Sequence, residues 1–116
     1  MKRALVVAAL FFAVSLRAET GFDSMLDAAK KGDDMARVVV AFSYYFGEYR
    51  DGTKVEKNLN KAFAWACLAG FQGNREGKKL ADGIGPKLTN RKEAEQLAGE
   101  YFKPYGAHPG TSKNQQ

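Results

Sequence analysis

Residues 36–73 read ARVVVAFSYYFGEYRDGTKVEKNLNKAFAWACLAGFQG, and this stretch decides the fold of the chain. In its second half, apolar or small residues recur at three- and four-residue spacing: Leu59, Ala62, Phe63, Ala66, Cys67 and Gly70. That spacing predicts one face of a helix, with Asn58 as its N-cap. The first half, residues 36–46, is ambiguous. Its valines and aromatics favour a strand, while Ala36, Val39, Val40 and Ser43 keep helical spacing.

Shorter helical patterns flank this stretch. Ahead of it, one face is formed by Phe22, Met25, Leu26 and Ala29. Gly32 is placed to end that helix, and Asp33 or Asp34 to cap the next. Residues 47–58 form a loop whose turn signal is Asp51-Gly52. After the stretch, the same spacing is kept by Gly77, Leu80, Ala81 and Ile84, and Gly85-Pro86 ends the pattern.

A last helix is predicted with Thr89 as its cap and Pro104 at its end. Its apolar side holds Ala94, Leu97, Ala98, Tyr101 and Phe102. The sequence therefore predicts about five short helices and no convincing strand pair. None of these helices buries its apolar face alone, so we expect an all-α fold of antiparallel helical hairpins packed side by side.

Small residues repeat along the chain at a separation of 41, the distance from Gly32 to Gly73. Each of these glycines is followed four residues later by another small residue, Ala36 or Gly77. Small side chains let the helices of neighbouring hairpins approach closely. This self-similarity predicts a helical repeat.

These residues resemble the Sel-one-like repeat family, which is related to the tetratricopeptide repeat. Its unit reads roughly A-x-x-x-L-G-x-x-Y-x-x-G-x-G-V-x-x-D-x-x-K-A-x-x-W-x-x-x-A-A-x-x-G. The matching positions here are Ala36, Val40, Ala41, Tyr44, Gly47, Val55, Asn58, Lys61, Ala62, Trp65, Ala69, Gly70 and Gly73. Ala41 replaces a Gly, Asn58 replaces an Asp, and the loop from Glu48 to Lys54 carries five extra residues. Without those five, the 41-residue spacing becomes 36, about the length of such a repeat.

The resemblance implies an α–α superhelix over residues 19–105 and makes residues 38–46 the first helix of a hairpin. It gives structural roles to the repeat-motif residues Gly32, Ala36, Tyr44, Gly47, Asn58, Ala62, Trp65, Ala69 and Gly73. It also implies a non-enzymatic adaptor that binds another protein. Some secreted relatives have been credited with hydrolytic activity. We do not expect this activity here, because those relatives are rich in cysteine pairs and this chain of 116 residues has one Cys.

The N-terminus has the pattern of a secretory signal peptide. A basic start, Met1 to Arg3, precedes an apolar run over residues 4–16, and Ala18 is a small residue ahead of Glu19. We therefore expect residues 1–18 to be removed and the protein to be periplasmic or secreted. The formal charge of +5 falls to about +2, because Lys2, Arg3 and Arg17 leave. Residues 106–116, rich in Gly, Ser, Asn and Gln, are predicted to be a disordered tail.

Nothing in the sequence favours catalysis or a cofactor. The one His, His108, falls in the predicted tail, and Cys67 lies on an apolar helical stripe where we expect it to be buried. A single His and a single Cys exclude a site built from several of them. Gly83 and Gly85 precede Pro86 without the pattern of a phosphate-binding loop. We expect no enzyme, no cofactor, no metal and no nucleic-acid partner, and a monomer.

Partner binding is expected at two places. Exposed aromatics in and near the long loop, and a basic stretch between Arg75 and Lys92, are the candidates. The individual residues are Tyr45, Tyr49, Arg50, Phe71, Arg75, Lys78 and Lys79. An alternative to protein binding is recognition of an anionic envelope polymer or a lipid head group by the basic stretch.

Overall fold

The computed structural model describes residues 20–106, and this part of the chain is all helical. The helices are α2 (Gly21–Lys30), α3 (Asp34–Phe46), α4 (Leu59–Phe71), α5 (Arg75–Ile84) and α6 (Arg91–Tyr101). A 3-10 turn, η1 (Gly85–Lys87), precedes α6, and a π-helical turn, η2 (Phe102–Gly106), follows it. Within residues 20–106 β pairing is limited to one isolated bridge between Glu48 and Lys54. The expected all-α fold is confirmed, and the ambiguous stretch is helix α3.

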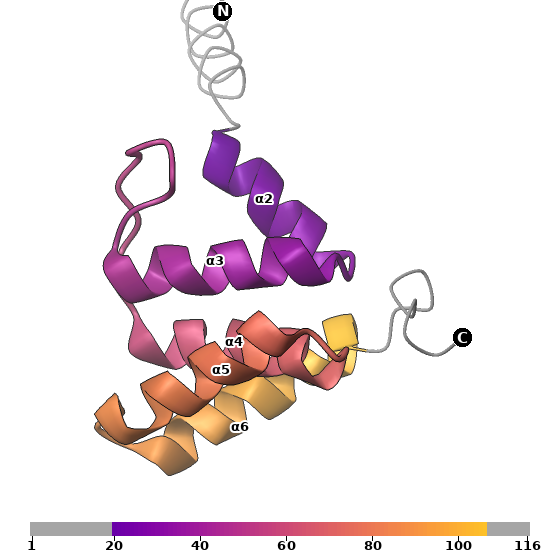
Figure 1. The fold of residues 1–116 in the computed structure, drawn as a ribbon, viewed down its shortest axis with the longest axis vertical. Coiled ribbons are helices and arrows are strands. Elements are labelled where there is room, and N and C mark those ends of the chain that lie inside the picture. Colours follow the sequence, from indigo (N-terminus) through magenta and orange to yellow (C-terminus); the bar gives the residue numbers. More distant parts are fainter. Residues whose placement is uncertain (1–19, 107–116) are drawn as a thin grey trace, which may run out of the picture.

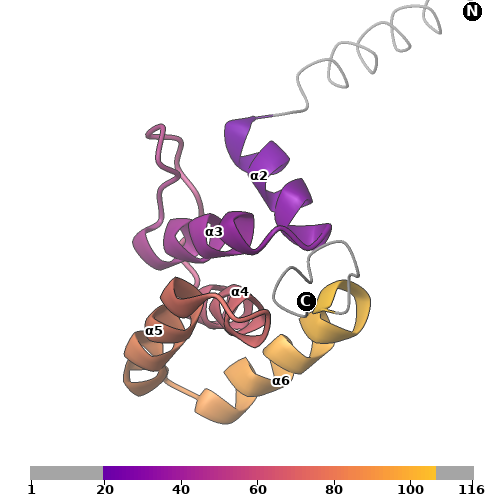
Figure 2. The same ribbon diagram turned by 45° about the vertical axis from the view of Figure 1, so that its right-hand side comes forward.

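Helix α4 is the centre of the domain. From α3 onward, consecutive helices run in alternating directions, and α4 lies between α3 on one side and α5 and α6 on the other (Figure 1). Both α5 and α6 pack extensively on α4 but scarcely touch each other, although they are neighbours in sequence (Figure 2). The last pair of helices therefore splays apart over α4.

The core forms where the apolar faces of these helices meet. Its largest fully buried apolar side chains are Trp65, Leu68, Ile84 and Val40. Trp65 of α4 lies against Tyr101 and Tyr105, with ring centroids 5.1 and 5.6 Å away. The end of the chain thus covers the centre of α4, and burying the indole removes a large apolar surface from water.

The 41-residue repeat is built into the backbone. Gly32 and Gly73 both have positive φ, 106° and 96°, at the ends of α2 and α4. The side chains of Asp33 and Asn74 then accept hydrogen bonds from the backbone N–H groups of Ala36 and Gly77, at 3.0 and 2.9 Å. Each corner therefore reverses the chain with a glycine of positive φ followed directly by a side chain, Asp33 or Asn74, that caps the next helix.

The small residue after each cap allows close packing. In the second corner, a methyl group on Gly77 would lie 2.5 Å from Cβ of Ala69 and 2.9 Å from the backbone nitrogen of Gly70. Both atoms belong to α4, so α5 touches α4 almost backbone to backbone. Any larger side chain at Gly77 must push the two helices apart.

Arg37 is a fully buried cation that ties four parts of the domain together. Its Nε donates to the Ala29 carbonyl of α2 at 2.8 Å and its Nη1 to Oε1 of Gln72 at 2.8 Å. Its Nη2 donates to the Tyr105 carbonyl of η2. Burial lowers the pKa of Arg37, and the charges of Asp34 and Asp33 oppose that shift. The guanidinium thus links the first described helix to the last turn.

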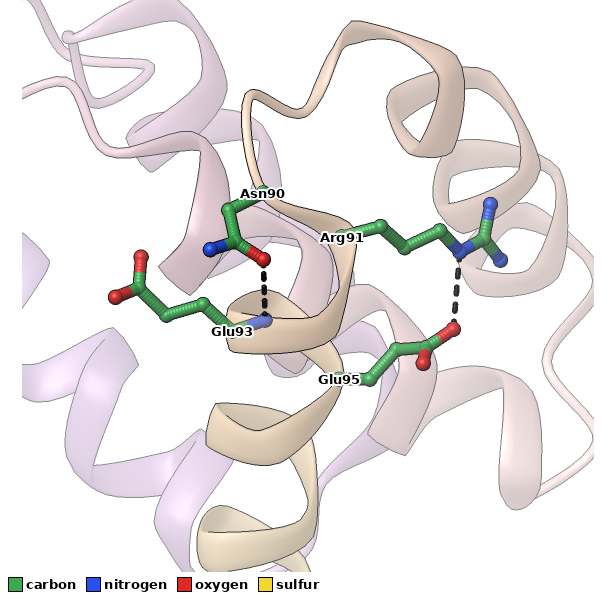
Figure 3. Close-up of polar contacts among 4 residues, drawn as sticks. All are labelled: Asn90, Arg91, Glu93 and Glu95. Carbon is green, nitrogen blue, oxygen red and sulfur yellow. Dashed lines mark hydrogen bonds and ion pairs between the residues drawn. The ribbon is translucent and has the colours of Figure 1, made fainter.

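Three local expectations differ from the structure. The cap of α6 is Asn90, whose side chain accepts from the Glu93 N–H at 3.1 Å, and not Thr89 (Figure 3). Pro104 does not end the helical path, because the π-helical turn continues to Gly106. Cys67 is half-buried and not fully buried. Predicted features at residues 1–18 and at His108 lie outside the described residues.

Among residues 20–106, none of the helices has the length and apolar character that crossing a membrane requires.

Candidate interaction surfaces

Helix α3 carries an exposed apolar stripe, formed by Met35, Val39, Phe42 and Phe46. Their spacing of four, three and four residues places them on one face. Met35 is 58% exposed and Phe46 66%, while Val39 is half-buried. The opposite face of α3 is filled by core residues such as Val40 and Tyr44, so α3 is apolar on both sides. A helix of this kind favours cover on both faces, and residues 20–106 supply it on one.

Aromatic contacts order the C-terminal end of this α3 stripe. The rings of Phe42 and Phe46 are stacked, 5.9 Å apart with an interplanar angle of 6°. Tyr45 meets Phe46 edge to face at 4.9 Å. These contacts hold large apolar rings at the surface in a fixed arrangement, which lowers the entropy that binding would cost.

The two aromatic residues proposed as anchors near the loop differ in exposure. Tyr45 is half-buried beside the α3 stripe, whereas Tyr49 is only 5% exposed and packs on Phe22 of α2 at 5.9 Å. Tyr49 therefore packs the long loop against α2, and its ring is not accessible to a partner. Arg50 is exposed, with its guanidinium 5.5 Å from the ring of Tyr49.

The other proposed anchors lie on the far side of α4. Phe71 is 73% exposed at the end of α4, and Arg75, Lys78 and Lys79 are exposed on α5. The structure brings Phe71 and Lys78 together around a small hollow that also contains Cys67. It leaves Tyr45, Tyr49 and Arg50 with α3 and the long loop. The predicted residues therefore form two separate groups.

A groove lies between α4 and α6, and we call it the α4–α6 groove. Its volume is about 500 Å³, and it is lined by Phe63, Cys67, Phe71, Arg91, Glu95, Ala98, Gly99 and Phe102. Six of these eight residues are apolar or glycine. The hollow at Lys78 adjoins it, since both contain Cys67 and Phe71. The splay of α5 from α6 leaves this side of α4 open.

Polar groups of the α4–α6 groove lie on one flank of α6. Arg91 donates from Nε to Glu95 at 2.9 Å, and its two terminal nitrogens point away from Glu95 (Figure 3). The Arg91 guanidinium lies 5.5 Å from the ring of Phe63. Burial raises the pKa of the Cys67 thiol on the groove floor to about 11, so this thiol stays protonated at neutral pH.

The α3 stripe was not singled out from the sequence. Its signal is a second apolar series at helical spacing on the same segment, beside the series that fills the core. The α4–α6 groove leaves no comparable signal, because it depends on how α5 and α6 diverge after Gly85. Within residues 20–106, no three side chains of the metal-binding types lie together.

Comparisons with known proteins give one informative result. No protein-family model matches the chain, and no solved structure matches it. The chain is similar to Wolframin of Homo sapiens, with 36% identity over 87 residues. The matched region is 71% of this chain and 10% of Wolframin, so the chain spans about a tenth of the length of that relative.

Proposed function

We propose that this chain is an exported, non-enzymatic interaction module that binds another protein through the α3 stripe. The observation that carries the proposal is the row of four apolar side chains on the outer face of α3, three of which are exposed and two of which are stacked phenylalanines. Large exposed apolar patches on soluble domains mark interaction sites. Aromatic anchors in such patches dominate binding energy.

We also propose that the chain is a divergent Sel-one-like repeat protein. The motif positions support this. Ala36, Tyr44, Ala62, Trp65 and Ala69 are all in the buried core, as packing positions of such a repeat would be. Asn58 caps α4 by accepting from the Lys61 N–H at 2.9 Å. The long loop, the largest departure from the motif, is closed by the bridge from Glu48 to Lys54.

Burial of the α3 stripe provides part of the free energy that specific binding requires. Fully burying a Phe or Met side chain is worth about 1.5–3 kcal/mol. Met35, Phe42 and Phe46 are partly buried already, so their cover by a partner contributes on the order of 3–5 kcal/mol in total. Hydrogen bonds and charges at the rim must add the rest of a micromolar affinity.

Export is part of the proposal because of the basic start, the apolar run and Ala18. Mass spectrometry of the protein from its native cell tests it. A mature N-terminus near Glu19 is expected, and a chain that keeps residues 1–18 would contradict export by this route.

The binding surface is tested by photo-crosslinking in the native cell. A photoreactive phenylalanine replaces Phe46 in one variant and the exposed Lys92 of α6 in a matched control. One specific protein should crosslink from position 46 and not from position 92. The crosslink from position 46 should disappear when Phe42→Glu is added. Equal crosslinking from both positions would remove the support for the α3 stripe.

A second candidate function is binding of an anionic envelope polymer by α5 and the start of α6. The observation that favours it is the exposure of Arg75, Lys78 and Lys79, none of which forms an ion pair within residues 20–106. Such binding should weaken steeply as salt rises. It should be lost in a variant with Glu at the four positions Lys78, Lys79, Arg91 and Lys92, and an unchanged affinity would contradict it.

A further inference from the structure

The α4–α6 groove has a direction. Phe63 lies near the start of α4 and Phe71 at its end, eight residues later, so the floor is about 12 Å long. Arg91 lies over Phe63 at one end. At the other end Phe71 and Phe102 meet edge to face, 5.7 Å apart, and both are exposed. Between these ends the floor and wall are Cys67, Ala98 and Gly99. The groove therefore has the Arg91–Glu95 ion pair at one end and an apolar length.

Arg91 has two direct contacts, and its guanidinium lies close to Gly85. Glu95 accepts from its Nε at 2.9 Å, the Phe63 ring lies under its guanidinium, and its Nη1 occupies space that a side chain at residue 85 would take. A methyl group on Gly85 would lie 2.7 Å from Nη1. Glu95 thus engages one edge of the guanidinium. The edge formed by Nη1 and Nη2 has no hydrogen-bond acceptor among residues 20–106.

We propose that the α4–α6 groove binds a monomeric anionic amphiphile, an unbranched acyl chain with a carboxylate head. The carboxylate accepts hydrogen bonds from Nη1 and Nη2 of Arg91 in the two-pronged geometry that guanidinium and carboxylate share. The acyl chain lies along Cys67 and Ala98 toward Phe71 and Phe102. This site shares no residue with the α3 stripe, so it is a function beyond the proposed protein binding.

The chemistry of the groove selects this class of ligand. A bare anion would gain only the Arg91 contact, which is exposed to water and already shares its charge with Glu95. A neutral hydrocarbon would leave the Nη edge of Arg91 unused. An amphiphile uses both ends of the groove, and the protonated Cys67 thiol on the floor adds no charge that would repel it.

Titration calorimetry with octanoate, decanoate and methyl decanoate, each below its aggregation concentration, tests the proposal. We expect saturable 1:1 binding of decanoate, about fourfold tighter than that of octanoate, because each methylene is half-covered in an open groove. Arg91→Gln should weaken decanoate binding about tenfold and leave methyl decanoate unchanged, since charge-assisted hydrogen bonds are lost.

Gly85→Ala is the sharper variant. It keeps every charge and a helical φ, but its methyl group displaces the Arg91 guanidinium. It should fold normally and weaken decanoate binding at least threefold, with no effect on methyl decanoate. Lys30→Gln, which removes an exposed cation on α2 outside the groove and outside the basic stretch, is the control and should bind as the parent does.

Three results would overturn the proposal. The first is no saturable binding of decanoate by the parent protein. The second is equal weakening by Lys30→Gln and Arg91→Gln, which would show a diffuse charge effect. The third is co-sedimentation with phosphatidylglycerol vesicles without binding of monomeric decanoate, which would assign the surface to a membrane.

Discussion

Replacing Gly77 by Ala tests whether close approach of α4 and α5 holds the second half of the domain together. The new Cβ would lie 2.5 Å from Cβ of Ala69 and 3.0 Å from the carbonyl oxygen of Ala66. Ordinary carbon–carbon contact is about 3.5–4.0 Å, so the helices must separate by about 1 Å. Two of the three atoms nearest the new methyl group are backbone atoms of α4, which no rotamer change can move.

The magnitude follows from two opposing effects. Overpacking of this kind costs about 3 kcal/mol, and Ala in place of Gly inside a helix returns about 1 kcal/mol. Gly77→Ala should therefore lower the free energy of unfolding by about 2 kcal/mol. In a domain of this size that corresponds to a melting temperature about 8–16 °C lower.

Gly83→Ala is the matched control, in the same helix and with the same change in chemistry. A methyl group there meets no atom within 4 Å, so only the gain in helix propensity remains. This variant should be stabilised by about 1 kcal/mol. Urea denaturation followed by circular dichroism measures both variants. If Gly77→Ala were as stable as Gly83→Ala, the close contact between α4 and α5 would carry no weight and the reasoning would be refuted.

The other predictions concern Arg37, Cys67 and the α3 stripe. Arg37→Met should lower the free energy of unfolding by about 3 kcal/mol in urea melts, because it removes the donor of one buried and two part-buried hydrogen bonds; a loss under 1 kcal/mol would contradict the linking role. Cys67 should react with iodoacetamide at pH 8 about a hundredfold more slowly in the folded than in the unfolded protein, since its pKa is raised from 9.0 to about 11. Because the unfolded state loses the thiol proton first, the free energy of unfolding should be unaffected by this group below pH 9 and should fall as the pH rises toward 11. Equal labelling rates in the folded and unfolded protein would refute the raised pKa. Phe46→Glu should leave stability within about 0.5 kcal/mol of the parent, because the side chain is exposed; a large loss in a thermal melt would place it in the core.

Local chemistry accounts for what the sequence predicted correctly. Asn58 and Asp33 were recognisable as caps because an N-cap depends on one side chain and the backbone three residues later. Thr89 and Asn90 are both common N-cap residues. The path of the chain after η1 places Asn90, and not Thr89, at the N-cap position of α6. The helical state of residues 36–46 was not decided by periodicity, since Val38, Val39 and Val40 suit either structure. It followed from the resemblance to a helical repeat.

Long-range packing accounts for what the sequence did not reveal. Tyr49 sits in a polar loop and looks exposed, but the loop folds back so that its ring meets Phe22, 27 positions earlier in the chain. The α4–α6 groove depends on the divergence of two helices that are each amphipathic in the ordinary way. Neither feature has a local signal, because both depend on where distant segments meet.

The buried guanidinium of Arg37 affects how this domain should unfold. In helical repeat proteins each repeat usually contacts only its neighbours, so the ends can unfold while the middle stays folded. Here one side chain near the start of the domain holds carbonyls from α2 and from the final turn at once. Unfolding of η2 would therefore disturb the Arg37 side chain, which also bonds to α2 at the other end of the domain. The first and the last parts of the domain should therefore unfold together, in a single cooperative transition.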